Sequence, residues 1–319
     1  MERYHLKTVS LENLMYGEGW GARYQYDDAF LTESIRAMGV LMPLVVSAGD
    51  QPRVVAGHKR AFASREAGLK EVPALVLKDE LPEKDLFRLA LVSNWREARH
   101  ELDAAWAVKR AGETGFDETE ILQEILPLLG LPSEHHWLSE FRSVVGLHAE
   151  LLDALSAGRI PFRGASLLSR FSPEEQAVFA GSLANKLHLT SSQLMKTAEW
   201  LLDMMRSPRR PLAEVLQAAP LREVLDCPQK DTRQKTDLFF KHLRDLRFPR
   251  LAAQEKAFES HARDIEKGQK GLKIEAPPYF EESGFSLRLK ARDPESLDHL
   301  MQVLAEKRTS MRELFKIVL

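Results

Sequence analysis

The segment of residues 53–65, RVVAGHKRAFASR, limits what this chain can fold into more than any other stretch. It begins with a short apolar strand, turns at Gly57, and places His58, Lys59 and Arg60 at the start of an alanine-rich helix. A glycine permits a tight turn, and the N–H groups at a helix N-terminus favour negative charge. Basic side chains there add charge-assisted hydrogen bonds to a phosphate. The segment predicts an anion site, although a solvated strand–helix connection has the same pattern.

Predicted helices and strands alternate around this segment. Residues 9–14 are expected to form a short strand, and the glycine- and aromatic-rich stretch after it a loop. A helix that Asp27 or Asp28 caps and Gly39 ends should follow. The other predicted elements are strands at 44–46, 53–56 and 72–77 and helices after residues 57 and 82. The alternation predicts a small α/β domain over residues 1–100.

The strand signal disappears over residues 101–206, where helical periods dominate. This predicts an all-α domain. Within it, residues 120–129 and 134–145 have helix-turn-helix proportions, although an ordinary αα-hairpin has the same pattern. Residues 207–244 look like a linker with a short helix or two.

A third unit, an α+β module, is expected over residues 245–319. Leu251, Phe258 and Ile265 recur at heptad spacing, so a helix there should pack on the following strands or on a second subunit. The remaining predicted elements are strands at 272–276 and 285–289 and a helix from Asp293 with Leu297, Leu300, Met301 and Leu304 as its buried face. The predicted fold class is therefore α+β and multidomain.

Composition narrows the functional classes. With a formal net charge of -2, any surface for nucleic acid must be a local basic patch. The single cysteine, Cys227, excludes an intrachain disulfide and a cysteine-rich metal site. Apolar runs long enough to cross a bilayer are absent from the sequence. We therefore expect a cytoplasmic protein without membrane contact.

Three stretches occur in an order typical of one family: FLTESIRAMGVLMPLVV at residues 30–46, VVAGHKRAFASREAGLKEVPALVL at 54–77, and LALVSNWREARHELDAAWA at 89–107. A fourth, at residues 151–176, is similar to the segment that follows the helix-turn-helix in that family. From about residue 9 to 201 the chain resembles the ParB family, whose N-terminal fold is shared with sulfiredoxin. The resemblance implies a ParB/sulfiredoxin-like domain followed by a helix-turn-helix domain.

The resemblance implies a nucleotide site. Family members bind CTP with Mg²⁺, and the glycine-basic box holds the phosphates. Carried over by position, Gly57, Lys59 and Arg60 would surround the triphosphate, with His58 where the family usually has an acidic residue. Arg23 stands where the family often carries an arginine before the first helix. It could face the nucleotide or be solvated, and the solvated position is the expected one.

A second box of the family pairs a glutamate with an asparagine near the phosphates and metal. Asn94 matches and is the implied metal ligand, whereas Ser93 replaces the glutamate. Glu97 stands where an arginine is expected, with Arg96 beside it as the candidate contact. The missing carboxylate removes a ligand suited to Mg²⁺, so CTP hydrolysis is expected to be weakened.

The candidate DNA contacts fall into two groups. The expected recognition helix, residues 134–145, also holds two glutamates, whose negative charge is repelled by a polyanion. DNA would then be held through backbone contacts of a second cluster, or the domain would contact protein. The candidate contacts are His135, His136 and Arg142 in the helix and Arg159, Arg163 and Arg170 in the second cluster.

The leading hypothesis is a ParB-like DNA-binding protein with a CTP-type switch, acting in chromosome or plasmid partitioning or related DNA organisation. The resemblance implies DNA, a ParA-like ATPase and a second copy of the chain as partners, with a nucleoid-associated location. Two alternatives remain open. One is a nucleotide-dependent kinase or nuclease of the same fold, with His58 as a proton carrier. The other is an adaptor that has lost nucleotide binding.

Overall fold

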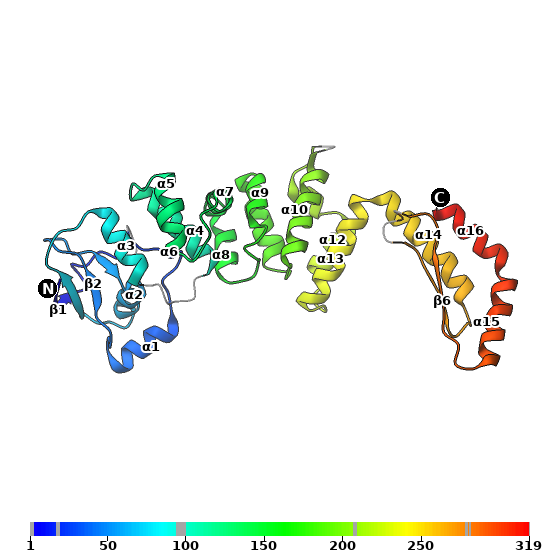
Figure 1. Cartoon of the computed structure of the whole chain (residues 1–319), viewed down its shortest axis with the longest axis horizontal. Coiled ribbons are helices and arrows are strands. Elements are labelled where there is room, and N and C mark those ends of the chain that lie inside the picture. Colours follow the sequence, from blue (N-terminus) through cyan, green and yellow to red (C-terminus); the bar gives the residue numbers. More distant parts are fainter. Residues whose placement is uncertain are drawn as a thin grey trace. The chain divides into compact units, whose positions relative to one another are not determined.

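The computed structural model describes residues 3–16, 20–93, 100–206, 209–277, 280 and 282–318. The chain divides into two compact units, Met1–Thr236 and Asp237–Leu319 (Figure 1). The first unit contains a small mixed sheet followed by helices, and the second a two-stranded sheet with helices. The predicted α+β class is confirmed. Among the described helices, none is long and apolar enough to cross a membrane.

The sheet of the first unit has the strand order β1-β4-β2-β3. Strand β4 runs antiparallel to β1 and parallel to β2, and β2 runs antiparallel to β3. The core of this sheet is apolar because the short strands β2 and β3 bury most of their side chains; Leu44, Val46 and Val54 are at most 1% exposed. The strands are β1 (Tyr4–Ser10), β2 (Leu44–Val46), β3 (Val54–Ala56) and β4 (Glu71–Leu77).

Three helices accompany the sheet: α1 (Ala29–Met38), α2 (His58–Glu66) and α3 (Glu83–Ser93). The caps predicted for α1 are confirmed. The Asp28 carboxylate accepts a hydrogen bond from the Leu31 N–H, and Gly39 follows the helix with a φ of 75°. Local side-chain chemistry therefore determines both ends of this helix.

Two predictions near the N-terminus were wrong in detail. The first strand was expected at residues 9–14, but β1 lies earlier, because it pairs with β4 along its whole length. Residues 20–28 of the predicted loop form no helix or strand, as predicted, yet Trp20 is only 2% exposed. Its indole N–H donates to Glu83 at 2.7 Å, and the Arg53 guanidinium lies 3.9 Å from the ring centroid.

The helical prediction for residues 101–206 is confirmed. The helix pair proposed there consists of two helical segments, residues 118–128 and α7, joined by a turn in which Gly130 has a φ of 75°. The elements are α4 (Glu101–Glu113), α5 (Glu118–Glu120), η1 (Ile121–Ile125), α6 (Leu126–Leu128), α7 (His135–Val145), α8 (Ala149–Ser156), η2 (Ala165–Arg170), α9 (Pro173–Phe179), η3 (Ala180–Ala184) and α10 (Ser191–Arg206).

The stretch 207–244 was expected to be a linker, but its described residues, 209–244, contain packed helices. It contains α11 (Leu212–Leu216), α12 (Ala219–Asp226) and most of α13 (Thr232–Arg247). Leu212 and Leu221 are fully buried, so these helices belong to a core rather than to a solvated connection. The boundary between the two compact units falls after Thr236, inside α13.

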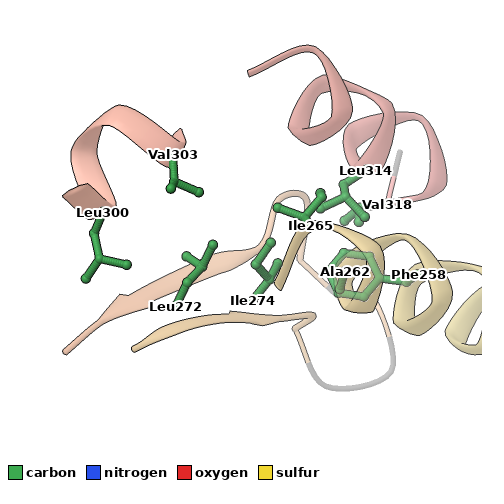
Figure 2. Packing of buried hydrophobic residues seen from close by; sticks show 9 residues of the cluster. All are labelled: Phe258, Ala262, Ile265, Leu272, Ile274, Leu300, Val303, Leu314 and Val318. Carbon is green, nitrogen blue, oxygen red and sulfur yellow. The ribbon is translucent and has the colours of Figure 1, made fainter. Parts of the chain in front are cut away.

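The second unit is built around the core shown in Figure 2. Phe258 and Ile265 of α14 are 2% exposed and pack in this core, so the predicted stripe is used largely within the chain. The elements are α14 (Pro249–Glu266), β5 (Leu272–Glu275), β6 (Ser286–Leu289), α15 (Pro294–Glu306) and α16 (Arg308–Val318), with β5 and β6 antiparallel.

The buried face predicted for α15 is only partly right. Leu300 is buried, but Leu297 and Met301 are 45% and 55% exposed, and Val303 takes their place in the core. Figure 2 shows Leu300 and Val303 on the side of Leu272. A sheet of two short strands covers a narrow stripe of a helix, so residues three apart suffice to fill it.

Candidate anion-binding site

The junction between β3 and α2 has the geometry that the sequence predicted. Gly57 has φ 98° and ψ 24°, and no side chain caps the helix. A Cβ at this position would lie 2.8 Å from Leu44 Cδ2, so glycine is required by space as well as by conformation. The carbonyl of Gly57 accepts from the Ala61 N–H at 2.9 Å. The N–H groups of the first helical turn therefore lie at the start of α2.

A cavity of about 340 Å³ lies at this helix start. Its size is within the range of ligand pockets. Three lining residues are cationic and one is a carboxylate, which gives the cavity a positive balance. The lining residues are Ala22, Arg23, Tyr26, Asp28, Leu31, Gly57, His58, Lys59 and Arg60.

Arg60 is held in place by backbone oxygens. Its Nη1 donates to the carbonyls of Met42 at 2.6 Å and Pro43 at 2.7 Å. Its Nη2 lies 3.1 Å from where a Cβ of Gly57 would stand, so the guanidinium reaches the helix start. Burial lowers the pKa of Arg60 below its ordinary value, but an arginine remains charged at neutral pH. The site thus contains a fixed positive charge.

Lys59 pairs with the carboxylate of Asp28 at 3.3 Å. The pKa of Asp28 is lowered, first by the hydrogen bond from the Leu31 N–H and then by Lys59. Each side chain of the pair is about a third exposed, so the interaction is weak and reversible. A phosphate in the cavity would compete with Asp28 for the ammonium group.

His58 does not supply the positive charge expected of it. The side chain is 5% exposed, and burial lowers its pKa to about 4, so the imidazole is neutral at pH 7. Its ring centroid lies 5.4 Å from that of Tyr26. Burial also raises the pKa of Tyr26 to about 12. These two rings form a neutral wall of the cavity.

The loop before α1 carries residues that the sequence reasoning missed. Arg23, expected to be solvated, is 17% exposed and lies 3.7 Å from Asp103 of α4. The Tyr24 N–H donates to the same carboxylate at 3.2 Å, and the Tyr24 hydroxyl donates to Asp153 of α8 at 2.8 Å. This loop therefore joins the cavity to the helical part of the unit. In the sequence, the run of aromatic and basic residues before the capping aspartate was the feature that could have indicated this role.

The second predicted box is represented by one described residue. Asn94 and Arg96 lie outside the described residues. Ser93 is described, and its hydroxyl donates back to the Leu89 carbonyl at 2.7 Å. Asp28 is the one carboxylate of the cavity lining, and no group of three metal-ligating side chains converges elsewhere among the described residues. The described residues do not form a site suited to Mg²⁺.

The predicted DNA contacts are not gathered into one surface. In α7, His135 and Arg142 pair with Glu118 at 3.2 Å and 3.0 Å, and His136 pairs with Glu134 at 3.0 Å. The hydrogen bond from Arg142 lowers the pKa of Glu118. Arg163 lines the same groove as His136, whereas Arg159 donates to Asn185 and Arg170 lines a different pocket.

The family model of the ParB N-terminal domain matches residues 6–95, which include most of β1, the whole β3–α2 junction and the cavity lining. This chain contains a ParB N-terminal domain. The predicted resemblance is thereby confirmed for the N-terminal domain, and the geometry above is that of a ParB N-terminal domain.

Curated ParB proteins match parts of the chain. The chromosome-partitioning protein ParB of Myxococcus xanthus is 44% identical over 96 residues, 30% of each chain. The chromosome-partitioning protein Spo0J of Thermus thermophilus is 32% identical over 148 residues, 46% of this chain and 52% of that protein. The chain thus spans about half or less of the length of these relatives.

A solved ParB structure matches a larger share of the chain at lower similarity. It is the C-terminally truncated chromosome-partitioning protein ParB from Caulobacter crescentus complexed to the centromeric parS site. The match covers 60% of this chain and 98% of that chain, with 20% identity and a TM-score of 0.35. A TM-score of this size transfers no geometry to the site.

Proposed function

We propose that this ParB-family chain binds a nucleoside triphosphate, CTP by family resemblance, at the β3–α2 junction. The bound nucleotide would change how the chain holds DNA in chromosome or plasmid partitioning. The observation that carries the proposal is the helix start itself. The first N–H groups of α2 lie at the cavity, and Arg60 stands fixed beside them. A polyphosphate is the ligand whose charge and oxygen spacing match such a site.

The cavity supplies the contacts that a triphosphate needs. The helix start offers backbone N–H groups, and Arg60 adds a guanidinium that is already positioned. Lys59 adds a second charge once it leaves Asp28. The neutral rings of His58 and Tyr26 exclude water from the inner wall and strengthen these interactions.

The loop of residues 20–28 offers a route from nucleotide to helical domain. Phosphate oxygens would draw Arg23 toward the cavity and so weaken its pairing with Asp103. Tyr24 would transmit the change to α8 through Asp153. Nucleotide would thereby favour one of two arrangements of the loop, which is a population shift.

Exposed apolar side chains beside the cavity fit the association of two N-terminal domains. Phe30 is 87% exposed and follows the capping Asp28 closely in the chain. Leu41 and Met42 are 73% and 70% exposed, and the Met42 carbonyl is one of the two that hold Arg60. Nucleotide binding at Arg60 would therefore act on the same surface that we propose to be covered in the dimer.

The test is a DNA mobility-shift assay with and without CTP, ATP or GTP. We expect one nucleotide to change the shift of wild-type protein and to have no effect on Arg60→Ala. Arg65→Ala is the matched control, because Arg65 lies exposed at the far end of the same helix and should behave as wild type. A DNA mobility shift that is the same with and without each nucleotide would contradict the proposed switch.

One observation favours a second candidate, an adaptor whose helical domain contacts protein. The groove of about 1090 Å³ beside α7 is lined by Glu101, Glu140 and Glu199 as well as by Arg163. Three carboxylates repel a DNA backbone. A nucleotide that binds the chain while no DNA shift appears at low salt would select this candidate.

A further inference from the structure

Four arginines gather around a second pocket, far along the chain from the β3–α2 junction. The pocket has a volume of about 700 Å³ and lies at the C-terminal end of α10. We call it the arginine pocket. All of its lining residues are described; they are Arg170, Glu175, Leu202, Met205, Arg206, Arg209, Arg210 and Pro211.

Three of these arginines lie at the end of α10 and just after it. Arg206 ends α10 and forms an isolated antiparallel bridge with Arg209. The Arg210 N–H then donates to the Met205 carbonyl at 3.0 Å. Met205, just before Arg206, is 9% exposed, and Leu212, two residues after Arg210, is fully buried, so both neighbours pack in the core. The arginines are therefore carried by a packed backbone.

The fourth arginine comes from a separate element. Arg170 ends η2, between Leu168, which is fully buried, and Phe171, which is 3% exposed. Glu175, the one carboxylate of the lining, is already used at the start of α9, where it accepts a hydrogen bond from the Ser172 N–H at 2.8 Å. Two parts of the fold thus direct cations at one pocket.

The positive charge of the arginine pocket is largely uncompensated among the described residues. Arg206 lies 4.0 Å from Asp203, at the limit of an ion pair, and Arg170, Arg209 and Arg210 form no ion pair there. The Arg210 Nε is buried and has no hydrogen-bond acceptor in the described part of the chain. Guanidinium groups that share a pocket repel one another, and an anion that bridges them would remove this cost.

We propose that the arginine pocket binds phosphate groups. Guanidinium groups match the paired oxygens of a phosphate in geometry as well as in charge. The phosphates can belong to a DNA backbone or to a free polyphosphate. In the first case the pocket deepens the DNA-binding part of the proposed function; in the second it is an independent regulatory site. Neither case uses the cavity at Gly57.

The experiment separates this pocket from the nucleotide site by using Arg60→Ala protein throughout. Inorganic pyrophosphate and a 24-base-pair duplex are titrated separately into this background. The test variant adds Arg209→Gln and Arg210→Gln. The matched control adds Arg222→Gln and Arg233→Gln, two exposed arginines of α12 and α13 that remove the same charge. Thermal unfolding of each variant shows that the fold is retained.

We expect the test variant to bind pyrophosphate at least about tenfold more weakly than the background, and the control to bind as the background does. If DNA is the source, the test variant also shows a salt slope of log K smaller by about two than the control. A loss of pyrophosphate binding with unchanged DNA binding assigns the pocket to a free polyphosphate. Equal binding of both probes by test and control variants would overturn the proposal, whatever CTP does at Arg60.

Discussion

Asp28 has three roles at the candidate site. Its carboxylate caps α1, lines the cavity and pairs with Lys59. The cap and the ion pair can be separated by substitution, because an asparagine keeps the capping oxygen and loses the charge. The effect of the Asp28 charge on anion binding can therefore be measured separately from its effect on α1.

We predict that Asp28→Asn binds CTP more tightly than wild type. Removing the carboxylate frees Lys59 and removes a negative charge from the cavity, an effect of about 1 kcal/mol or about fivefold in Kd. Asp28→Ala should show the same gain in CTP affinity. It also loses the cap of α1, which lowers stability by about 1 kcal/mol. Calorimetric titration and chemical unfolding measure the two effects. A weaker CTP affinity in Asp28→Asn would show that Asp28 serves the ligand.

His58 makes the stability of the N-terminal domain depend on pH. Its pKa is about 4 in the folded chain, against an ordinary value of 6.5, so between these values the unfolded chain binds a proton that the folded chain does not. Stability is therefore present above pH 6.5 and is lost as the pH falls toward 4. The other titratable or charged groups that line the same cavity are Arg23, Tyr26, Asp28, Lys59 and Arg60.

We predict that wild type loses about 2 kcal/mol more stability than His58→Gln between pH 7 and pH 4.5. The comparison cancels the contributions of the carboxylates that both proteins share. Urea unfolding at a series of pH values gives the difference. Parallel curves would mean that the His58 side chain is solvated.

At the scale of the element, the loop of residues 20–28 is the physical connection between cavity and helices. Asp153 of α8 accepts hydrogen bonds from the Tyr24 hydroxyl and from Gln25 Nε2, at 2.8 Å and 3.0 Å. The Tyr24 ring also packs edge-on against Trp106 of α4. Two helices thus hold the loop that carries Arg23.

We predict that Asp153→Ala binds CTP with unchanged affinity but shows a smaller effect of CTP on DNA binding. The substitution removes the acceptor that both loop side chains share and leaves the cavity intact. Glu150→Ala is the control, since Glu150 is exposed on the first turn of the same helix. Titration with CTP and mobility shifts with and without CTP give the two quantities. Full coupling in Asp153→Ala would exclude this loop as the connection.

The sequence predicted well those elements whose start or end is determined by residues nearby in the chain. Helices α1 and α15 begin at capping aspartates and the β3–α2 junction turns at a glycine, all readable within a few residues. The failures depend on partners distant in the chain. Trp20 is buried by Arg53 and Glu83, and β1 is set by β4. The pattern of polar and apolar residues does not reveal these distant partners.

The sequence likewise predicted only part of the candidate site. The order of residues 57–60 indicated Gly57, Lys59 and Arg60, which line one cavity. The neutrality of His58 follows from tertiary burial, which no local pattern reveals. The arginine pocket was missed because residues 207–211 have the composition of a linker, whereas Met205 and Leu212 on either side of them are buried in the first unit.

At the scale of the whole molecule, we propose that nucleotide brings two copies of the N-terminal domain together. The exposed Phe30 lies beside the cavity, and the chain has one cysteine, Cys227. In a Cys227→Ser background, Phe30→Cys should form a covalent dimer with a short bismaleimide when CTP is present and far less without it. Asp50→Cys, on the turn between β2 and β3, is the control that should not respond. Equal crosslinking with and without CTP would contradict the nucleotide-driven association.

The most direct test of the central claim is a calorimetric titration of CTP into wild type and Arg60→Ala. Arg60 supplies the fixed charge at the start of α2, and a lost hydrogen bond to a charged group costs about 1.5–3 kcal/mol. We predict that wild type binds CTP and that Arg60→Ala binds it about ten to a hundred times more weakly, while Arg65→Ala binds as wild type. The same CTP affinity in wild type and Arg60→Ala, or no binding by wild type, would contradict the account.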